Sequence, residues 1–334
     1  MLSTSMTALP RVPQFPSPVS ADWTAAYTRC LDSEASASGS SGVQSWVLGY
    51  LLLQAPTQSG RNSLSREINS CLDHEKLHEL CMLYINHFVR AFKAGTKSPT
   101  ASPSYHPSEE PTNHLNAKSK ALRRDRYRCA LSGSFDWTSV TTIGSVQQEY
   151  VNLPSPKPGS VPTQAAHIFP QSTNRGISGG DKHMYAAGVW AVLEHFCRSS
   201  MLDRLDGDNI HRLENIITMP QHLHTLFDGL DIWLEEDQNI ANHYQVCALN
   251  REFLPAGFPT DVTFTTPDPE KLPLPSPDLL LLHAICARVA RLSGAGQYVG
   301  TVLRDLEDTT VLSPGGESAQ LLFHALAPLD TVGY

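Results

Sequence analysis

Residues 213–228 read Leu-Glu-Asn-Ile-Ile-Thr-Met-Pro-Gln-His-Leu-His-Thr-Leu-Phe-Asp. The spacing of their apolar side chains predicts a helix over 216–227, and Gly229 is the type of residue that commonly follows a helix end. On such a helix, His224 and Asp228 are one turn apart and lie on the same face. A ring nitrogen and a carboxylate oxygen in this arrangement can reach one divalent cation. The stretch therefore predicts a helix with two candidate metal ligands.

Two further polar residues accompany this helix in sequence. His167 lies in Gln164-Ala-Ala-His-Ile-Phe-Pro170, which predicts a short strand over 163–169. An imidazole can take a proton from water near neutral pH, because its ordinary pKa is about 6.5. Asn215, nine residues before His224, offers an amide that can hold such a ring in one tautomer without adding charge. His167 and Asn215 are therefore the candidate catalytic residues.

Ordered pieces of the sequence resemble the HNH family, the ββα-metal nucleases, and more narrowly the HNH-domain proteins of filamentous fungi. The pieces are Arg128-Cys-Ala-Leu-Ser-Gly133, Ala166-His-Ile-Phe-Pro170, Asn215-Ile-Ile-Thr218 and His224-Thr-Leu-Phe-Asp228. The downstream run Leu279-Leu-Leu-Leu-His-Ala284 is also similar to a usual companion of this fungal group. Together the pieces are a specific signal, whereas any one of them alone would be weak.

The resemblance implies a metal-dependent endonuclease or phosphodiesterase acting on DNA or RNA. It implies that His167 is the general base that activates water and that Asn215 orients the active-site loop and this base. His224 and Asp228 would bind the metal, which would stabilise charge on the scissile phosphate. A histidine and a carboxylate with open positions suit Mg²⁺, Mn²⁺ or Zn²⁺, and the sequence does not choose among them.

The sequence departs from the family pattern at one position of the site. Many HNH sites place an aspartate or histidine ligand immediately before the base, where this chain has Ala166. Asp181 and His183 are candidate substitutes, although a helix start is the simpler interpretation of both. Cys129 also has no cysteine at the spacing of a structural zinc knuckle. The alternative hypothesis is therefore a non-nucleolytic HNH-derived scaffold, such as an accessory enzyme or binding module in a fungal biosynthetic pathway.

The expected fold class is α+β: a ββα-metal core with an inserted helix, an N-terminal helical segment and a C-terminal hairpin plus helix. Strands are expected over 127–131 and 163–169, an insertion over 134–162, the inserted helix over 181–197, a hairpin over 231–249 and a helix over 278–292. The expected domains are a flexible arm (1–19), a helical segment (20–95), a Ser/Pro-rich linker (96–116), an HNH nuclease-like domain (117–250) and a C-terminal extension (251–334) whose helix packs on the core.

Composition sets broad limits on the partners and location of the chain. The 334 residues carry a net charge of −8, but residues 114–230 hold 12 Lys and Arg against 10 Asp and Glu. This permits a nucleic acid partner, while no apolar run is long enough to span a membrane. Seven scattered cysteines and the absence of a secretory leader predict an intracellular protein, cytoplasmic or nuclear. Oligomeric state is not predicted.

Two basic features near the site have more than one interpretation. The run Arg123-Arg-Asp-Arg-Tyr-Arg128 is interpreted as a solvated helix face, with phosphate binding as the alternative. His222 lies two residues before His224 and so points off the ligand face. It is interpreted as a surface or phosphate-contacting residue rather than a ligand.

Overall fold

The fold is that of a computed structural model of the chain. It describes residues 7–36, 42–93, 111–170 and 207–310, together with Val189, Val192, Leu193, His195 and Phe196. The candidates Asp181 and His183, and most of the expected inserted helix, lie outside the described residues. The described residues form helices and small sheets, which confirms the α+β class.

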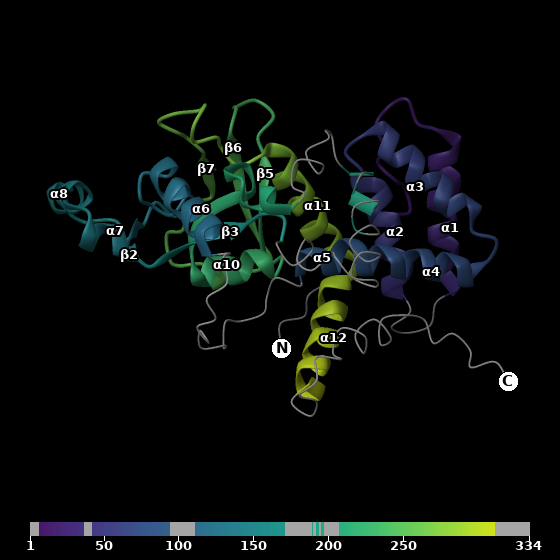
Figure 1. The fold of residues 1–334 in the computed structure, drawn as a ribbon. Helices are drawn as coiled ribbons and strands as arrows, with labels where there is room; N and C mark the ends of the chain where they lie inside the picture. The colour runs from purple at the N-terminus through teal and green to yellow at the C-terminus, as the bar shows by residue number, and fades with distance from the viewer. Residues whose placement is uncertain are drawn as a thin grey trace. The chain divides into compact units, whose positions relative to one another are not determined.

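The chain divides into two compact units (Figure 1). Unit 1 comprises Met1–Lys93, Gly176–Arg198 and Ile285–Tyr334. Unit 2 comprises Ala94–Arg175 and Ser199–Ala284. This grouping differs from the expected division, because residues 251–284 belong with the unit that holds the candidate site.

Unit 1 is built from helices. They are α1 (Ala21–Ser36), α2 (Gly42–Gln54), α3 (Gln58–Ser70), α4 (His74–Tyr84), the π-helical turn η2 (Ile85–Val89), α5 (Arg90–Lys93) and α12 (Ala295–Thr310). The side chains of Thr57 and Asp73 accept hydrogen bonds from backbone amides in the first turns of α3 and α4, which explains where these helices begin. The stretch expected to be a flexible arm makes specific contacts here: Leu9 is buried, and the Tyr27 hydroxyl donates to the Pro10 carbonyl.

Unit 2 holds the candidate site. Its helices are α6 (Pro111–Arg124), α7 (Trp137–Thr142), α8 (Gly144–Asn152), the 3-10 turns η6 (Gly207–His211), η7 (Leu213–Asn215) and η8 (Arg251–Phe253), α10 (Gln221–Asp228), and the first part of α11 (Pro277–Ser293). Its strands are β1 (Phe135–Asp136), β2 (Ser160–Val161), β3 (Thr163–His167), β4 (Ile216–Pro220), β5 (Ile232–Glu236), β6 (His243–Ala248) and β7 (Asp261–Thr263). Figure 1 shows α7 and α8 projecting from the rest of this unit.

The predicted helix over 216–227 is wrong in its first part, which is strand β4. β4 pairs antiparallel with β3, so that Ile216 lies opposite His167. The β-branched side chains of Ile216 and Ile217 favour a strand, and both are fully buried. Pro220 ends the strand, because it lacks the amide hydrogen that a continuing ladder would need. It is also the N-cap of α10. The result is a two-stranded sheet followed directly by a helix.

The predicted strand over 127–131 is replaced by turns. Only one isolated bridge, between Arg128 and Phe135, is formed in this part of the described chain. The Gly133 amide donates to the Cys129 carbonyl, and Gly133 has a φ of +70°, which glycine adopts without steric cost. The expected insertion over 134–162 is not irregular throughout, since it holds α7, α8 and the parallel pair β1–β2.

The C-terminal hairpin and the following helix are confirmed. β5, β6 and β7 form an antiparallel sheet, and α11 covers the predicted helix. Among the described residues, no single helix is long and apolar enough to cross a membrane; α11 and α12 reach that length and composition only as a pair bent by 90°.

Candidate active site

The two predicted metal ligands on α10 lie side by side. His224 Nε2 is 3.3 Å from Asp228 Oδ2, and both side chains are largely buried. Two ligands that share one ion with tetrahedral or octahedral geometry are about 3.0–3.4 Å apart, because each bond is about 2.1 Å long. Burial raises the pKa of Asp228 to about 7, so a bound cation would favour its charged form. The α10 pair therefore has the spacing that a shared cation requires.

A residue that the sequence analysis missed orients His224. The Nδ1 atom of His224 lies 2.8 Å from Oε1 of Gln164, which is on β3. The amide oxygen can only accept, so it fixes the proton on Nδ1 and leaves the lone pair on Nε2, the nitrogen that faces Asp228. Gln164 in turn donates to the side chain of Gln221 on α10. No motif marks this glutamine, since the contact depends on how α10 packs on β3.

The position of the missing ligand is clear from the pleat of β3. Successive side chains point to opposite faces of a strand, so Ala166 shares the α10 side with Gln164. Ala165 faces the other way, into a buried cluster with Ala121 of α6. Ala166 is fully buried. Within the described part of the chain, no group of three His, Cys, Asp or Glu side chains could hold a metal ion.

Asn215 is fully buried and bonded to the backbone around the end of β3. Its side-chain oxygen accepts from the Phe169 amide at 2.7 Å, and its Nδ2 donates to the Phe169 carbonyl at 3.0 Å. The same Nδ2 donates to the Ile210 carbonyl at 2.9 Å. One amide side chain thus joins the segment after His167 to the 3-10 turn η6.

His167 forms a pair with His211, another residue that the sequence analysis missed. Nε2 of His167 lies 3.0 Å from Nδ1 of His211, which is the last residue of η6. One ring must donate and the other accept, so the contact fixes the orientation of both rings. The described contacts therefore gather the four predicted residues into two groups, His167 with Asn215 and His224 with Asp228. β3 carries both His167 and Gln164, and by the alternation of the strand His167 lies on the Ala165 side while Gln164 lies on the α10 side.

Comparison with known protein families finds one match for the part of the chain that holds this site. The HNH endonuclease family matches residues 129–235, a range that holds all four predicted site residues. Residues 129–235 are an HNH endonuclease domain. No curated protein and no solved structure matches the chain.

Two buried charged residues brace this HNH domain. Arg124, at the end of α6, donates to the carbonyls of Leu213 and Ile216 at 2.8 Å, on either side of Asn215. Arg124 is fully buried, so the interpretation of the whole basic run as a solvated face is wrong for this residue. Asp136 accepts hydrogen bonds from Ser139 and Thr163. These bonds outweigh the effect of burial and hold the pKa of Asp136 below its usual value.

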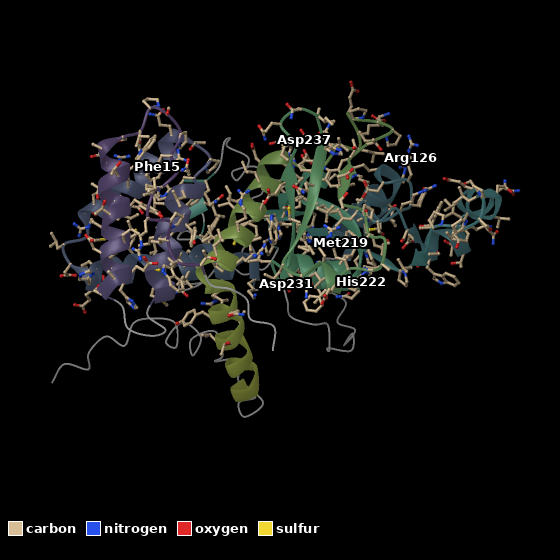
Figure 2. The ribbon with its side chains drawn as sticks, turned by 180° about the vertical axis from the view of Figure 1, so that it is seen from behind. Phe15, Arg126, Met219, His222, Asp231 and Asp237 are labelled. Carbon is tan, nitrogen blue, oxygen red and sulfur yellow. The ribbon has the colours of Figure 1, made fainter. Side chains whose placement is uncertain are left out.

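The remaining histidine of α10 is separate from the site of the HNH domain. His222 is exposed on the first turn of α10 (Figure 2), as the helical spacing predicts. Leu223, the next residue, is buried. His222 therefore provides a surface control for substitutions at the site.

Proposed function

We propose that the HNH domain is a metal-dependent phosphodiesterase that cleaves DNA or RNA, with His167 as the general base. The observation that supports this most is the His224–Asp228 pair, whose 3.3 Å separation suits one divalent cation. The pair lies on α10, directly after the β3–β4 sheet that carries His167. This order of two strands followed by a helix supports the ββα-metal interpretation.

The donor set fits a cation that takes only part of its shell from the protein. One imidazole and one carboxylate leave several positions for water or phosphate oxygens, as Mg²⁺ and Mn²⁺ sites commonly do. When bound, the ion would stabilise negative charge on the scissile phosphate and the leaving oxygen. The ligands would be His224 Nε2 and Asp228 Oδ2, with Gln164 orienting the imidazole.

The other residues would prepare the attacking water. His167 would accept its proton, and the hydrogen bond with His211 would keep the imidazole of His167 in one orientation. Asn215 would act as a positioning residue, because it holds the backbone at Phe169, two residues beyond the base. A general base at the correct place commonly accelerates a reaction by about 10²–10⁴-fold.

A second candidate function is an HNH-derived scaffold that does not cut nucleic acid. It is favoured by the fully buried Ala166 at the position of a further ligand, and by a net charge of −8. This candidate predicts that the protein neither binds Mn²⁺ nor cleaves any nucleic acid. The two candidates therefore differ in a measurable property.

The test is cleavage of plasmid DNA and single-stranded RNA in Mg²⁺ or Mn²⁺ by the full chain. Wild-type protein should cleave at least one of them, and His167→Ala should lower the rate by about 10²-fold or more. His222→Ala, an exposed histidine on α10, should cleave like the wild type. Equal rates for His167→Ala and the wild type would refute the assignment of the base.

A further inference from the structure

The exposed surface of α6 and of the turn after it carries basic side chains that form no ion pair with the acids in the described part of the chain. Lys120 and Arg123 are exposed, and Arg126, just past the helix end, is exposed as well. With the half-buried Lys118 they place four cations within nine residues. Within the described residues, none of these four side chains forms an ion pair. We call Lys118, Lys120, Arg123 and Arg126 the α6 stripe.

The other face of the same helix explains why the stripe faces outward. Ala117 and Ala121 are buried in a cluster with Ala165 of β3, and Arg124 is fully buried. Arg123 points away from Ala117 and Ala121, while Lys120 lies at the edge of the buried face, and both side chains are exposed. The amphipathic pattern of α6 thus fixes the direction of its exposed cations.

The chain turn after α6 adds Arg126 to the stripe. Arg126 and Tyr127 have φ values of +53° and +57°, which side-chain-bearing residues rarely adopt. Hydrogen bonds from the Tyr127 amide to the Leu122 carbonyl and from the Arg128 amide to the Asp125 carbonyl hold this turn. The turn leaves Arg126 exposed just past the end of α6 (Figure 2).

Most other cations of unit 2 are engaged by acids or by the backbone. Arg128 pairs with Glu149 at 2.7 Å, and Arg212 pairs with Glu214 at 3.0 Å. The long-chain cations elsewhere on its surface, Lys157, Arg251 and Lys271, are each bonded to a carbonyl or a carboxylate. The α6 stripe is therefore the concentration of positive charge left for an external anion in the described part of this unit.

The stripe lies close to the candidate active site. α6 packs directly on β3, β4 and η6, the elements that carry His167 and His211. A helix with its side chains is about 10–12 Å across, whereas one turn of duplex DNA is about 34 Å long. A single turn of duplex could therefore contact both the α6 stripe and the strand that holds His167.

We propose that the α6 stripe binds the phosphodiester backbone of the nucleic acid that the HNH domain cleaves. The proposal rests on the proposed function, because it assumes a nucleic acid substrate. Lysine and arginine side chains bind phosphates without reading sequence, and each contact releases a counterion. The α6 stripe would supply affinity and hold the strand beside His167, while taking no part in the chemistry.

The test is the binding of a fluorescent DNA duplex to the full chain, measured by anisotropy in EDTA over a range of NaCl concentrations. The triple variant Lys120→Gln, Arg123→Gln, Arg126→Gln should bind about tenfold more weakly or worse. The slope of log affinity against log salt should fall by about 2–3, near 0.9 for each lost phosphate contact. Unchanged melting temperature would show that this variant is folded.

The matched control removes the same charge elsewhere. Lys76→Gln, Lys157→Gln, Lys271→Gln changes three exposed cations outside α6 and should keep the affinity and the salt slope of the wild type. Equal losses in both triple variants, or no binding by the wild type, would overturn the proposal. The two proposals can fail separately. Cleavage that survives His167→Ala refutes the assignment of the base, while unchanged duplex affinity in the Lys120, Arg123, Arg126 triple variant refutes only the binding role of the α6 stripe.

Discussion

Asn215 shows how one buried amide can set the geometry of a site without touching the reacting atoms. Its three side-chain hydrogen bonds tie Phe169 and Ile210 together, at the end of β3 and in η6. These are the segments that carry His167 and His211, whose rings are bonded at 3.0 Å. The His167–His211 pair therefore depends on a residue that contributes no charge.

We predict that Asn215→Ala destabilises the protein and breaks the hydrogen bond between His167 and His211. The substitution leaves a buried amide hydrogen and two buried carbonyls without their partner, which costs on the order of 3 kcal/mol in the free energy of unfolding. Urea unfolding would measure this loss. Asn239→Ala, at an exposed turn residue, should change the stability little, and an equal effect of both variants would contradict the role of Asn215.

At the scale of the element, the two faces of β3 contact different helices. Gln164 and Ala166 point toward α10, and Ala165 points toward α6. Gln164 orients His224, but the methyl group of Ala166 offers no donor to a cation. The pleat of a single short strand thus explains both the orientation of His224 and why β3 offers no further candidate ligand on the α10 side.

We predict that Ala166→Asp tightens Mn²⁺ binding about tenfold, because it adds a carboxylate on the α10 side of β3. Isothermal titration with Mn²⁺ would measure the change. Ala165→Asp is the matched control, since it places the same carboxylate on the α6 side, in a buried apolar cluster. That variant should lose stability and gain no affinity; a similar gain in both variants would show that the strand face does not matter.

The elements were only partly predictable from sequence. The i, i+4 spacing of His224 and Asp228 was sufficient to place both on one helix face, because helix geometry is local. The strand β4 was missed because the short, mostly apolar run Ile216-Ile-Thr-Met219 fits a helix and a strand equally well. Only its pairing with β3 determines that it is a strand. Gln164 and His211 were missed for the same reason, because their contacts join segments far apart in the chain.

At the scale of the whole molecule, one buried histidine links α11 to α10, the helix with the two candidate metal ligands. His283 Nε2 donates to the carbonyl of Phe227 at 3.0 Å, and the two rings stack at 3.7 Å. Phe227 immediately precedes Asp228 at the end of α10. Burial lowers the pKa of His283 to about 4, so the native state holds this ring neutral.

We predict that this histidine makes the native protein less stable in acid. Between about pH 6.5 and pH 4 the unfolded chain binds a proton at His283 and the native state does not, so stability falls as the pH is lowered through this range. The difference between the ordinary pKa of 6.5 and the native pKa of about 4 corresponds to about 3 kcal/mol in the free energy of unfolding. His283→Phe should remove that part of the pH dependence in urea unfolding, and identical pH profiles for variant and wild type would contradict it.

The most direct test of the central claim is the rate of nucleic acid cleavage as a function of Mn²⁺ concentration. The wild type should show no cleavage in EDTA and a saturable rise in rate with Mn²⁺. Half of the maximal rate should need a high Mn²⁺ concentration, because His224 and Asp228 leave most positions around the ion to water or phosphate. Asp228→Asn should need far more Mn²⁺ or fail to respond, while Asp261→Asn, at an exposed position of β7, should match the wild type. Cleavage with the same Mn²⁺ dependence in Asp228→Asn and the wild type would contradict the claim that this pair holds the catalytic metal.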